Sequence, residues 1–278
     1  MRRIFIIFPL ALSLILGIFI IYFNFKNLNI FKKDQENKIT FLEQQLDKNY
    51  RRNFPVHLPI LLYHYIENVT DERDTIRKSL NVSPFIFDSQ IRLLLEKGFT
   101  IITLKELINY YNGQSSLPDK PIILSFDDGY RDFYTDVFPI LQKYHVPAVL
   151  YVTSGFVDLT HNYLTMSQLK TLAKSNLVEI GAHGVNHLNL NYSDPVSINS
   201  EIFQSKANLE QFIGKPVEHF AYPMGEYNQN VINLIKKAGY LSGATTDMGV
   251  TQSYGQIFEL KRIRPGSSQG EYFLSLLK

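Results

Sequence analysis

Cysteine is absent from this chain of 278 residues. Its absence excludes disulfide bonds, thiolate metal sites and a lipidated cysteine, so any metal ion must be held by His, Asp or Glu. Tryptophan is absent as well, although there are 17 tyrosines and 20 phenylalanines, which at these counts mostly fill cores. The formal net charge is only +2. A broad basic surface is therefore missing, and we expect no nucleic-acid partner.

The N-terminal segment Ile4–Phe23 is apolar over twenty residues and follows Arg2 and Arg3. About 20 such residues cross a ~30 Å hydrocarbon core as a helix. A cleaved signal peptide is the alternative, but the segment is long and no small-x-small cleavage site follows it. We therefore expect an uncleaved, single-pass transmembrane helix, with the large C-terminal part of the chain on the extracytoplasmic side of the cell membrane. A secreted protein is the alternative localisation.

The remainder of the chain has the composition of a globular protein, with enough apolar residues for a sizeable core. Polar and charged residues dominate between the apolar segment and residue 53, where Ile39, Leu42 and Leu46 have helical spacing. We expect three segments: a membrane anchor (1–25), a polar stalk or linker (26–53) and a globular domain (54–278).

Two adjacent carboxylates follow an apolar strand predicted at residues 122–126. Asp127 and Asp128 come directly after this run, and Gly129 follows them. Adjacent residues of a regular strand point to opposite faces, so both carboxylates reach one site only if the chain bends, which Gly129 permits. A surface Asp-Asp-Gly turn is the alternative. Buried carboxylates are costly unless they are paired or bind a cation, so the apolar strand before them favours a functional site.

Two histidines four residues apart follow a second predicted strand. The strand at 178–182 runs into His183 and His187, with Gly184 between them. On one helical turn these positions share a face, so both imidazoles can bind one cation. The pair lacks the internal Glu of a zinc-protease motif. A base must come from elsewhere, and Asp127 or Asp128 is available.

Strands alternate with helices from residue 59 onward, which predicts a parallel α/β sheet or barrel. The polar residues at 64, 127–128, 183–187 and 222–223 all follow strand ends, which a barrel gathers at one rim. One Asp and two His around an open metal position form a hydrolytic metal site. The other Asp then serves as general base and His64 as acid. A backbone N–H near Met224 can stabilise the oxyanion formed from an amide or ester.

Three segments, 125–129, 183–187 and 221–225, resemble in order the leading motifs of the polysaccharide deacetylases (NodB homology, carbohydrate esterase family four). The resemblance covers about residues 58–265. It implies an α/β fold, a distorted (β/α) barrel, preceded here by the predicted transmembrane helix. It also implies removal of N-acetyl groups from N-acetylglucosamine polymers, or occasionally of O-acetyl groups from sugars. The resemblance implies these roles: Asp127 as base, and Asp128, His183 and His187 as metal ligands.

Residues 61–65 resemble the branch that includes biofilm poly-β-1,6-N-acetylglucosamine deacetylases, in which an N-terminal His replaces the acid of other members. No Leu-x-x-His motif follows residue 219, which agrees with His64 as the acid. Three positions depart from the family pattern: Gly184 replaces Ser or Thr, Ala221 replaces an Arg, and Met224 replaces an aromatic residue. Because that Arg orients the base, Arg262 or Arg264 is expected to take its place. The expected substrate or oxyanion residues are Tyr130, Tyr222, Pro223 and Met224.

The leading hypothesis is a membrane-anchored, metal-dependent N-deacetylase acting on poly-β-1,6-N-acetylglucosamine. Peptidoglycan or chitooligosaccharides are alternative substrates, and a catalytically silent polysaccharide-binding accessory protein is an alternative of another class. A two-carboxylate glycosidase needs carboxyl groups at least ~5 Å apart across the sugar, which suits adjacent aspartates less well. Imidazole and carboxylate ligands favour zinc, with cobalt or nickel also suitable.

Overall fold

The computed structural model describes residues 7–69 and 73–278, without the side chains of residues 7–21, 24 and 31. It divides into two compact units, Met1–Tyr50 and Arg51–Lys278. Within the described residues no helix is both long enough and apolar enough to cross a membrane. The first residues of the predicted anchor, and most of its side chains, lie outside the described part. The anchor and the predicted three-segment division therefore stay predictions.

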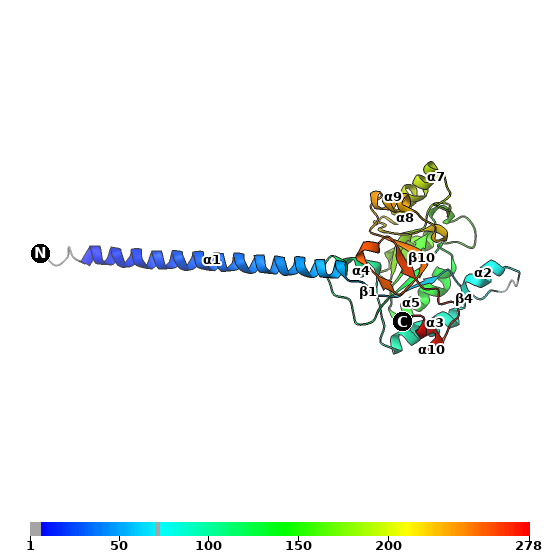
Figure 1. Cartoon of the computed structure of the whole chain (residues 1–278), viewed down its shortest axis with the longest axis horizontal. Coiled ribbons are helices and arrows are strands. Elements are labelled where there is room, and N and C mark those ends of the chain that lie inside the picture. Colours follow the sequence, from blue (N-terminus) through cyan, green and yellow to red (C-terminus); the bar gives the residue numbers. More distant parts are fainter. Residues whose placement is uncertain (1–6, 70–72) are drawn as a thin grey trace. The chain divides into compact units, whose positions relative to one another are not determined.

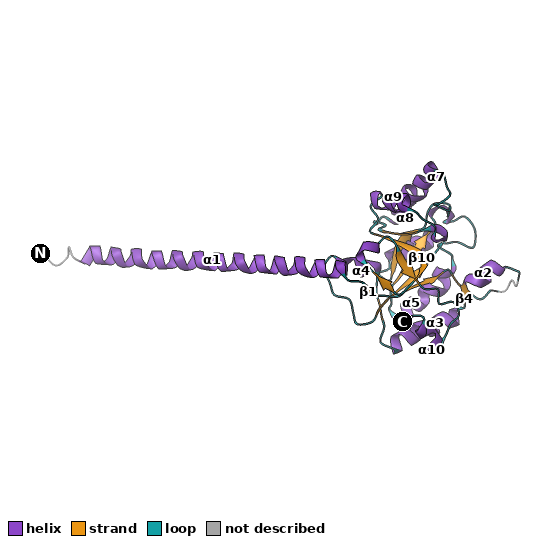
Figure 2. Ribbon diagram, viewed as in Figure 1, coloured by secondary structure: helices purple, strands orange, loops and turns teal. Residues whose placement is uncertain are grey.

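Strands and helices alternate through the second unit, where the strands lie in the middle and helices surround them (Figures 1 and 2). The strands are β1 (Val56–His57), β2 (Ile60–Tyr63), β3 (Tyr65–Ile66), β4 (Asn81–Val82), β5 (Thr100–Ile101), β6 (Pro121–Phe126), β7 (Ala148–Val152), β8 (Val178–Ala182), β9 (His219–Ala221), β10 (Ser242–Met248), β11 (Thr251–Gln252) and β12 (Leu260–Arg262). The α-helices are α1 (Ile7–Asn53), α2 (Thr75–Leu80), α3 (Pro84–Glu96), α4 (Leu104–Tyr111), α5 (Phe138–Tyr144), α6 (Met166–Lys174), α7 (Pro195–Asn199), α8 (Ser205–Ile213), α9 (Gln229–Lys237) and α10 (Gly270–Ser275).

Eight of these strands form one parallel sheet, in the order β12-β10-β9-β8-β7-β6-β2, with β5 pairing the start of β6. The two ends of the sheet approach each other beyond β12. Leu62 N–H donates to the Ile263 carbonyl at 2.8 Å, and Ile263 N–H donates to the Ile60 carbonyl at 2.8 Å. The sheet is therefore a nearly closed parallel β/α barrel. The register shift between β10 and β12 is one source of its irregularity.

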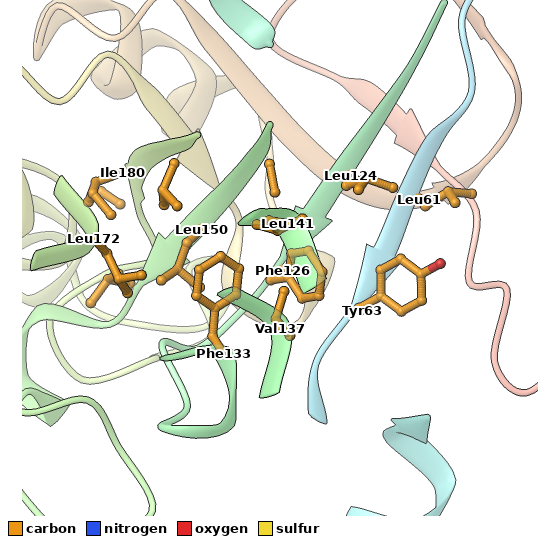
Figure 3. Packing of buried hydrophobic residues seen from close by; sticks show 14 of the residues in the cluster. Leu61, Tyr63, Leu124, Phe126, Phe133, Val137, Leu141, Leu150, Leu172 and Ile180 are labelled. Carbon is orange, nitrogen blue, oxygen red and sulfur yellow. The ribbon is translucent and has the colours of Figure 1, made fainter. Parts of the chain in front are cut away.

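Side-chain alternation along the strands gives the barrel two apolar layers. Leu124, Phe126 and Leu150 point outward against helical residues such as Phe133 and Leu141 (Figure 3). A second cluster lies on the opposite face of the same strands and includes Ile123, Val149, Tyr151, Ala221 and Ala244. Each fully buried large apolar side chain contributes about 1.5–3 kcal/mol. The two layers fix the register of each strand, and with it the face on which the next polar residue emerges.

Helix boundaries follow from local capping. The Asn228 side chain accepts hydrogen bonds from the N–H groups of residues 230 and 231, so α9 begins directly after it. Asp194 caps α7 in the same way. From α7 the chain continues through a π-helical turn, η3 (Ser200–Gln204), into α8. A second π-helical turn, η1 (Phe133–Val137), leads into α5.

Candidate active site

Asp127 continues the inward alternation of β6, after Ile123 and Ser125. Its side chain is 3% exposed, and its carboxylate accepts two hydrogen bonds from Arg262, from Nη1 at 2.7 Å and from Nη2 at 2.8 Å. Arg262 occupies the end of β12 and also donates from Nε to the Thr245 carbonyl at 2.6 Å. Burial raises the pKa of Asp127, but the charge and hydrogen bonds of Arg262 outweigh it, and the pKa lies below its ordinary value. Asp127 is therefore ionised at neutral pH.

Asp128 reaches the same rim by a bend in the backbone. Regular alternation would turn it toward the outer layer with Phe126, but its φ of 75° is left-handed and redirects the side chain. Gly129 follows with φ of 77°. A Cβ there would lie 3.1 Å from the Val152 side chain. Asp128 Oδ1 lies 3.4 Å from Nε2 of His183 and 3.4 Å from Nε2 of His187.

The two histidines converge without a helical turn, so the helical part of the prediction is wrong. His183 directly follows β8, and the backbone then turns left-handed at Gly184 (φ 81°) and at His187 (φ 56°). Left-handed residues cannot continue a right-handed helix. His183 is buried, and its Nδ1 lies 2.8 Å from the Ala221 carbonyl. A carbonyl oxygen can only accept a hydrogen bond, so Nδ1 carries the proton and Nε2 is free to act as a ligand.

Asp128, His183 and His187 together form a candidate metal site. Each offers one ligand atom, and these three atoms lie within 4.8 Å of one another. Burial lowers the pKa of both histidines, so both are neutral imidazoles at pH 7, the form that binds metal. Burial raises the pKa of Asp128 in the metal-free protein, a cost that a bound cation offsets.

A pocket of about 440 Å³ opens over these residues. Of the site residues expected from the sequence, the lining includes His64, Asp127, Asp128, Tyr130, His183, His187, Tyr222, Met224 and Arg264. Arg262 and Pro223 are buried and do not line it. The two candidate arginines thus occupy different places. Arg262 pairs with Asp127 beneath the pocket floor, whereas Arg264 is exposed at the pocket wall.

His64 follows β2 and lines this pocket. Burial lowers its pKa to about 4, with Arg262 acting in the same direction and Asp127 opposing them. His64 is therefore neutral at pH 7 in the substrate-free protein. A neutral imidazole acts as an acid only after it has received a proton.

The third motif forms a tight turn beside the pocket. The Tyr222 hydroxyl is occupied, because it donates to the Phe258 carbonyl at 2.8 Å. Met224 has a left-handed φ of 62° and is 57% exposed. Two backbone hydrogen bonds close the turn. The N–H of Gly225 donates to the Tyr222 carbonyl at 2.9 Å, and the N–H of Glu226 donates to the Pro223 carbonyl at 3.2 Å. The N–H of Met224 is not among the donors that close it.

An aromatic wall around Tyr130 was not predicted from the sequence. The Tyr130 ring stacks on Tyr65 with centroids 3.8 Å apart and on Tyr163 with centroids 5.3 Å apart. Phe156 packs against Tyr163 at 4.8 Å. Tyr163 comes from the segment after β7, and no local pattern around Tyr130 indicates this pairing. Of these residues, Tyr130, Phe156 and Tyr163 line the pocket, so one side of it is aromatic.

Glu201 was also missed, although the sequence carries a signal for it. Its carboxylate is fully buried and accepts hydrogen bonds from the loop between the two histidines. Residues 201, 205 and 209 are spaced by four, so they share one helical face, and Leu209 is buried. An acidic residue that shares a helical face with a buried leucine indicates a buried partner.

Comparison with known proteins gives the family of the chain. Residues 114–243 match the sequence model of the family described as polysaccharide deacetylase. A Bacillus subtilis (strain 168) protein named as a polysaccharide deacetylase, YxkH, is 30% identical over 227 residues, which cover 80% of this chain and 78% of that protein. The poly-β-1,6-N-acetyl-D-glucosamine N-deacetylase of Staphylococcus aureus (strain MSSA476) is 27% identical over 254 residues, covering 87% of this chain and 81% of that protein.

Among solved structures, the Streptococcus pyogenes deacetylase PplD in complex with acetate superposes with a TM-score of 0.74 at 29% sequence identity. The superposition covers 81% of this chain and 100% of PplD. The matches to the two relatives and the superposition thus each cover most of the chain. The chain belongs to the polysaccharide deacetylase family of enzymes.

Proposed function

We propose that this enzyme is a metal-dependent hydrolase that removes N-acetyl groups from poly-β-1,6-N-acetylglucosamine. The observation that carries the proposal is the pairing of a buried Asp127–Arg262 ion pair with the adjacent Asp128, His183 and His187 cluster in one pocket. The substrate class rests on the name of the Staphylococcus aureus relative. The acetate bound to PplD supports acetyl removal as the reaction.

The donor set fits a divalent transition-metal ion. Two neutral imidazoles and one carboxylate are the three protein ligands that catalytic zinc sites use, with further positions left for substrate or water. The hydrogen bond from His183 to Ala221 fixes the tautomer that such a ligand needs. Zinc suits these ligands, and cobalt and nickel suit them as well. When bound, the ion polarises the acetyl carbonyl and lowers the pKa of water toward ~7.

Asp127 is the proposed general base, and Arg262 is the residue that orients it. Two parallel hydrogen bonds fix both carboxylate oxygens, so the carboxylate cannot rotate away from the pocket. Arg262 also keeps Asp127 ionised, as a base must be before it accepts a proton from water. The low pKa limits the basicity of Asp127. The proton that Asp127 takes from water therefore passes to His64, a stronger base that lines the same pocket.

His64 is the proposed acid for that amine. It is neutral at pH 7 in the substrate-free protein, so it first receives the water proton from Asp127 and then gives it to the amine nitrogen as the C–N bond breaks. The Met224 N–H is the proposed donor to the oxyanion, because the turn holds this residue at a fixed left-handed φ beside the pocket. The aromatic side of the pocket, formed by Tyr130, Phe156 and Tyr163, is the proposed packing surface for the sugar ring.

Acetate release from N-acetylglucosamine oligomers tests the reaction. We expect wild-type activity to be abolished by a chelator and restored by zinc or cobalt. The Asp127→Asn variant should lose about 10²- to 10⁴-fold in kcat, the usual contribution of a general base. Equal acetate release from wild type and Asp127→Asn would reject the proposed base. Absence of release from both would favour a silent polysaccharide-binding protein.

The polymer is tested separately with poly-β-1,6-N-acetylglucosamine, peptidoglycan and chitooligosaccharides assayed side by side. We expect the highest kcat/KM on the β-1,6 polymer. A preference for peptidoglycan or chitooligosaccharides would leave the reaction intact and change only the substrate.

The predicted anchor leads to a proposal about location, namely a single-pass membrane protein with its catalytic unit on the extracytoplasmic side. It rests on the apolar run Ile4–Phe23. Cell fractionation combined with protease accessibility of the intact cell tests it. Recovery of the full-length chain in the growth medium or the cell interior would contradict it.

A further inference from the structure

A single buried carboxylate holds the loop that carries His187. Glu201, on the π-helical turn η3, has no exposed surface. Its oxygens accept hydrogen bonds from the backbone N–H groups of Val185 at 3.0 Å, Asn186 at 2.9 Å and Leu188 at 3.3 Å. The side-chain amide of Asn186 donates a further bond at 3.2 Å. The bonds therefore fall on both sides of His187.

The loop N–H groups are the compensation for burying this charge. No lysine or arginine of the described chain lies within ion-pair distance of Glu201. A buried carboxylate without hydrogen bonds is strongly unfavourable, and each hydrogen bond from a backbone N–H offsets part of that cost. The carboxylate and the loop thus depend on each other.

That shape is not one the loop adopts readily by itself. His187 has a left-handed φ of 56°, which is unfavourable for a residue with a side chain. In this conformation its Nε2 lies 3.4 Å from Asp128 Oδ1. A regular helical turn over the same residues would move the imidazole elsewhere. The bonds from Glu201 are what holds the unfavourable backbone on either side of His187.

Gly184 leaves the space that Glu201 occupies. A Cβ built at Gly184 would lie 2.4 Å from Glu201 Oε2 and 3.5 Å from Pro223. Its φ of 81° is also left-handed. The glycine next to the first histidine is therefore matched to the carboxylate behind the loop.

We propose that Glu201 is a positioning residue that sets the metal affinity of the Asp128, His183 and His187 cluster by fixing the backbone around His187. The inference rests on the proposed metal site. Glu201 neither lines the pocket nor belongs to the ligand cluster, so it acts through the loop. Partners of this kind typically change metal affinity by about 10- to 100-fold.

Metal binding, measured without reference to activity, tests this role. The affinity of the metal-free protein for cobalt is measured by chelator competition, and the visible absorption of bound cobalt reports its coordination. We expect Glu201→Gln to weaken cobalt binding by about 10- to 100-fold and to change the absorption spectrum. Glu179→Gln is the matched control, because Glu179 also accepts two backbone N–H bonds, from Leu104 at 2.8 Å and from Lys105 at 3.1 Å, away from the metal cluster. It should bind cobalt like wild type.

Two glycine variants test the inference if Glu201→Gln does not fold. In Gly184→Ala the added methyl group would clash with the Glu201 carboxylate. Gly214→Ala is its control, because it adds the same methyl group at a left-handed φ of 67° with no atom within 4 Å. We expect only Gly184→Ala to weaken cobalt binding. Wild-type affinity in a folded Glu201→Gln protein, or in a folded Gly184→Ala protein, would overturn the inference and leave the proposed function standing. A wild-type protein that binds no cobalt or zinc would overturn the metal site itself.

Discussion

Arg262 and Asp127 meet inside the barrel through two parallel hydrogen bonds of 2.7 and 2.8 Å, both side chains being almost fully buried. They come from strands β12 and β6, which lie far apart in the chain and on different parts of the sheet. The pair is thus formed only when the sheet curves toward closure. Folding of the barrel and preparation of the proposed base are the same event.

The first prediction concerns this pair. Arg262→Lys keeps the charge but loses the planar fork that holds both oxygens. We expect kcat to fall by about 10- to 100-fold, the scale of a small misplacement of a catalytic group. We also expect the pKa of Asp127 to rise toward its ordinary range, because Arg262 holds it down. The acid limb of the pH profile of kcat/KM should then move to higher pH.

Arg264→Lys is the control for that experiment, since Arg264 lies at the exposed pocket wall and makes no bond to Asp127. Its acid limb should match that of wild type. An unchanged acid limb in Arg262→Lys would show that the ion pair does not set the pKa of the base.

The second prediction concerns His64. His64→Asn should lower kcat by about 10²- to 10⁴-fold, the contribution of a general acid, with little change in metal content because His64 is not one of the clustered ligands. His57→Asn is the control, since His57 is exposed on β1. Substrates with a better leaving amine need less help from an acid, so they should recover part of the loss. Equal loss on every leaving group would assign His64 a role other than proton donation.

The third prediction uses two glycines with the same backbone angle. Gly98 and Gly129 both have φ of 77°, but a Cβ at Gly98 meets no atom within 4 Å, whereas one at Gly129 lies 3.1 Å from Val152. We expect Gly98→Ala to cost about 1 kcal/mol in free energy of unfolding, from the strained φ alone. Gly129→Ala should cost more, up to about 3 kcal/mol. Only Gly129→Ala should also weaken metal binding, because it shifts Asp128.

Denaturant unfolding of both variants measures the difference. Equal losses of stability, together with wild-type metal affinity in both, would mean that the turn tolerates a side chain at Gly129. The bend that redirects Asp128 would then not depend on this glycine.

The strands could be predicted from the sequence, because strands that are buried on both faces appear as short apolar runs. The polar residues of the site could be predicted as well, because they directly follow these runs. The bend after Asp127 was predictable for the same reason. The way in which His183 and His187 converge could not be predicted, since a spacing of four residues favours a helical turn. The observed loop is hydrogen-bonded to Glu201, which lies outside the motif that contains the two histidines. The roles of Asp127 and Asp128 came from family resemblance.

The choice between Arg262 and Arg264 was equally open, because it depends on where β12 ends. Leu260 and Arg262 point inward in register with the inner layer, and the strand stops at Arg262. Arg264 lies beyond it, where alternation no longer holds. No local feature of the sequence marks that end, since the pairing of β12 with β10 includes an irregular register.

The last prediction concerns a buried histidine outside the pocket. His219 is buried at the start of β9 with Nδ1 2.9 Å from the Ser242 hydroxyl, and burial lowers its pKa to about 3. The unfolded chain binds this proton near pH ~6.5, so the unfolded state takes up more protons as the pH falls. The stability associated with neutral His219 is therefore complete above pH ~6.5 and is lost progressively toward pH 3.

At 1.36 kcal/mol per pH unit, the loss between pH 6.5 and pH 5 is about 2 kcal/mol. His219→Asn retains a group that can bond Ser242 but does not titrate in this range. We expect its free energy of unfolding to fall about 2 kcal/mol less than that of wild type over the same interval, as measured by urea unfolding at several pH values. His57→Asn, at an exposed site, should follow the wild-type curve. Parallel curves for wild type and His219→Asn would show that His219 is protonated equally in the folded and unfolded states.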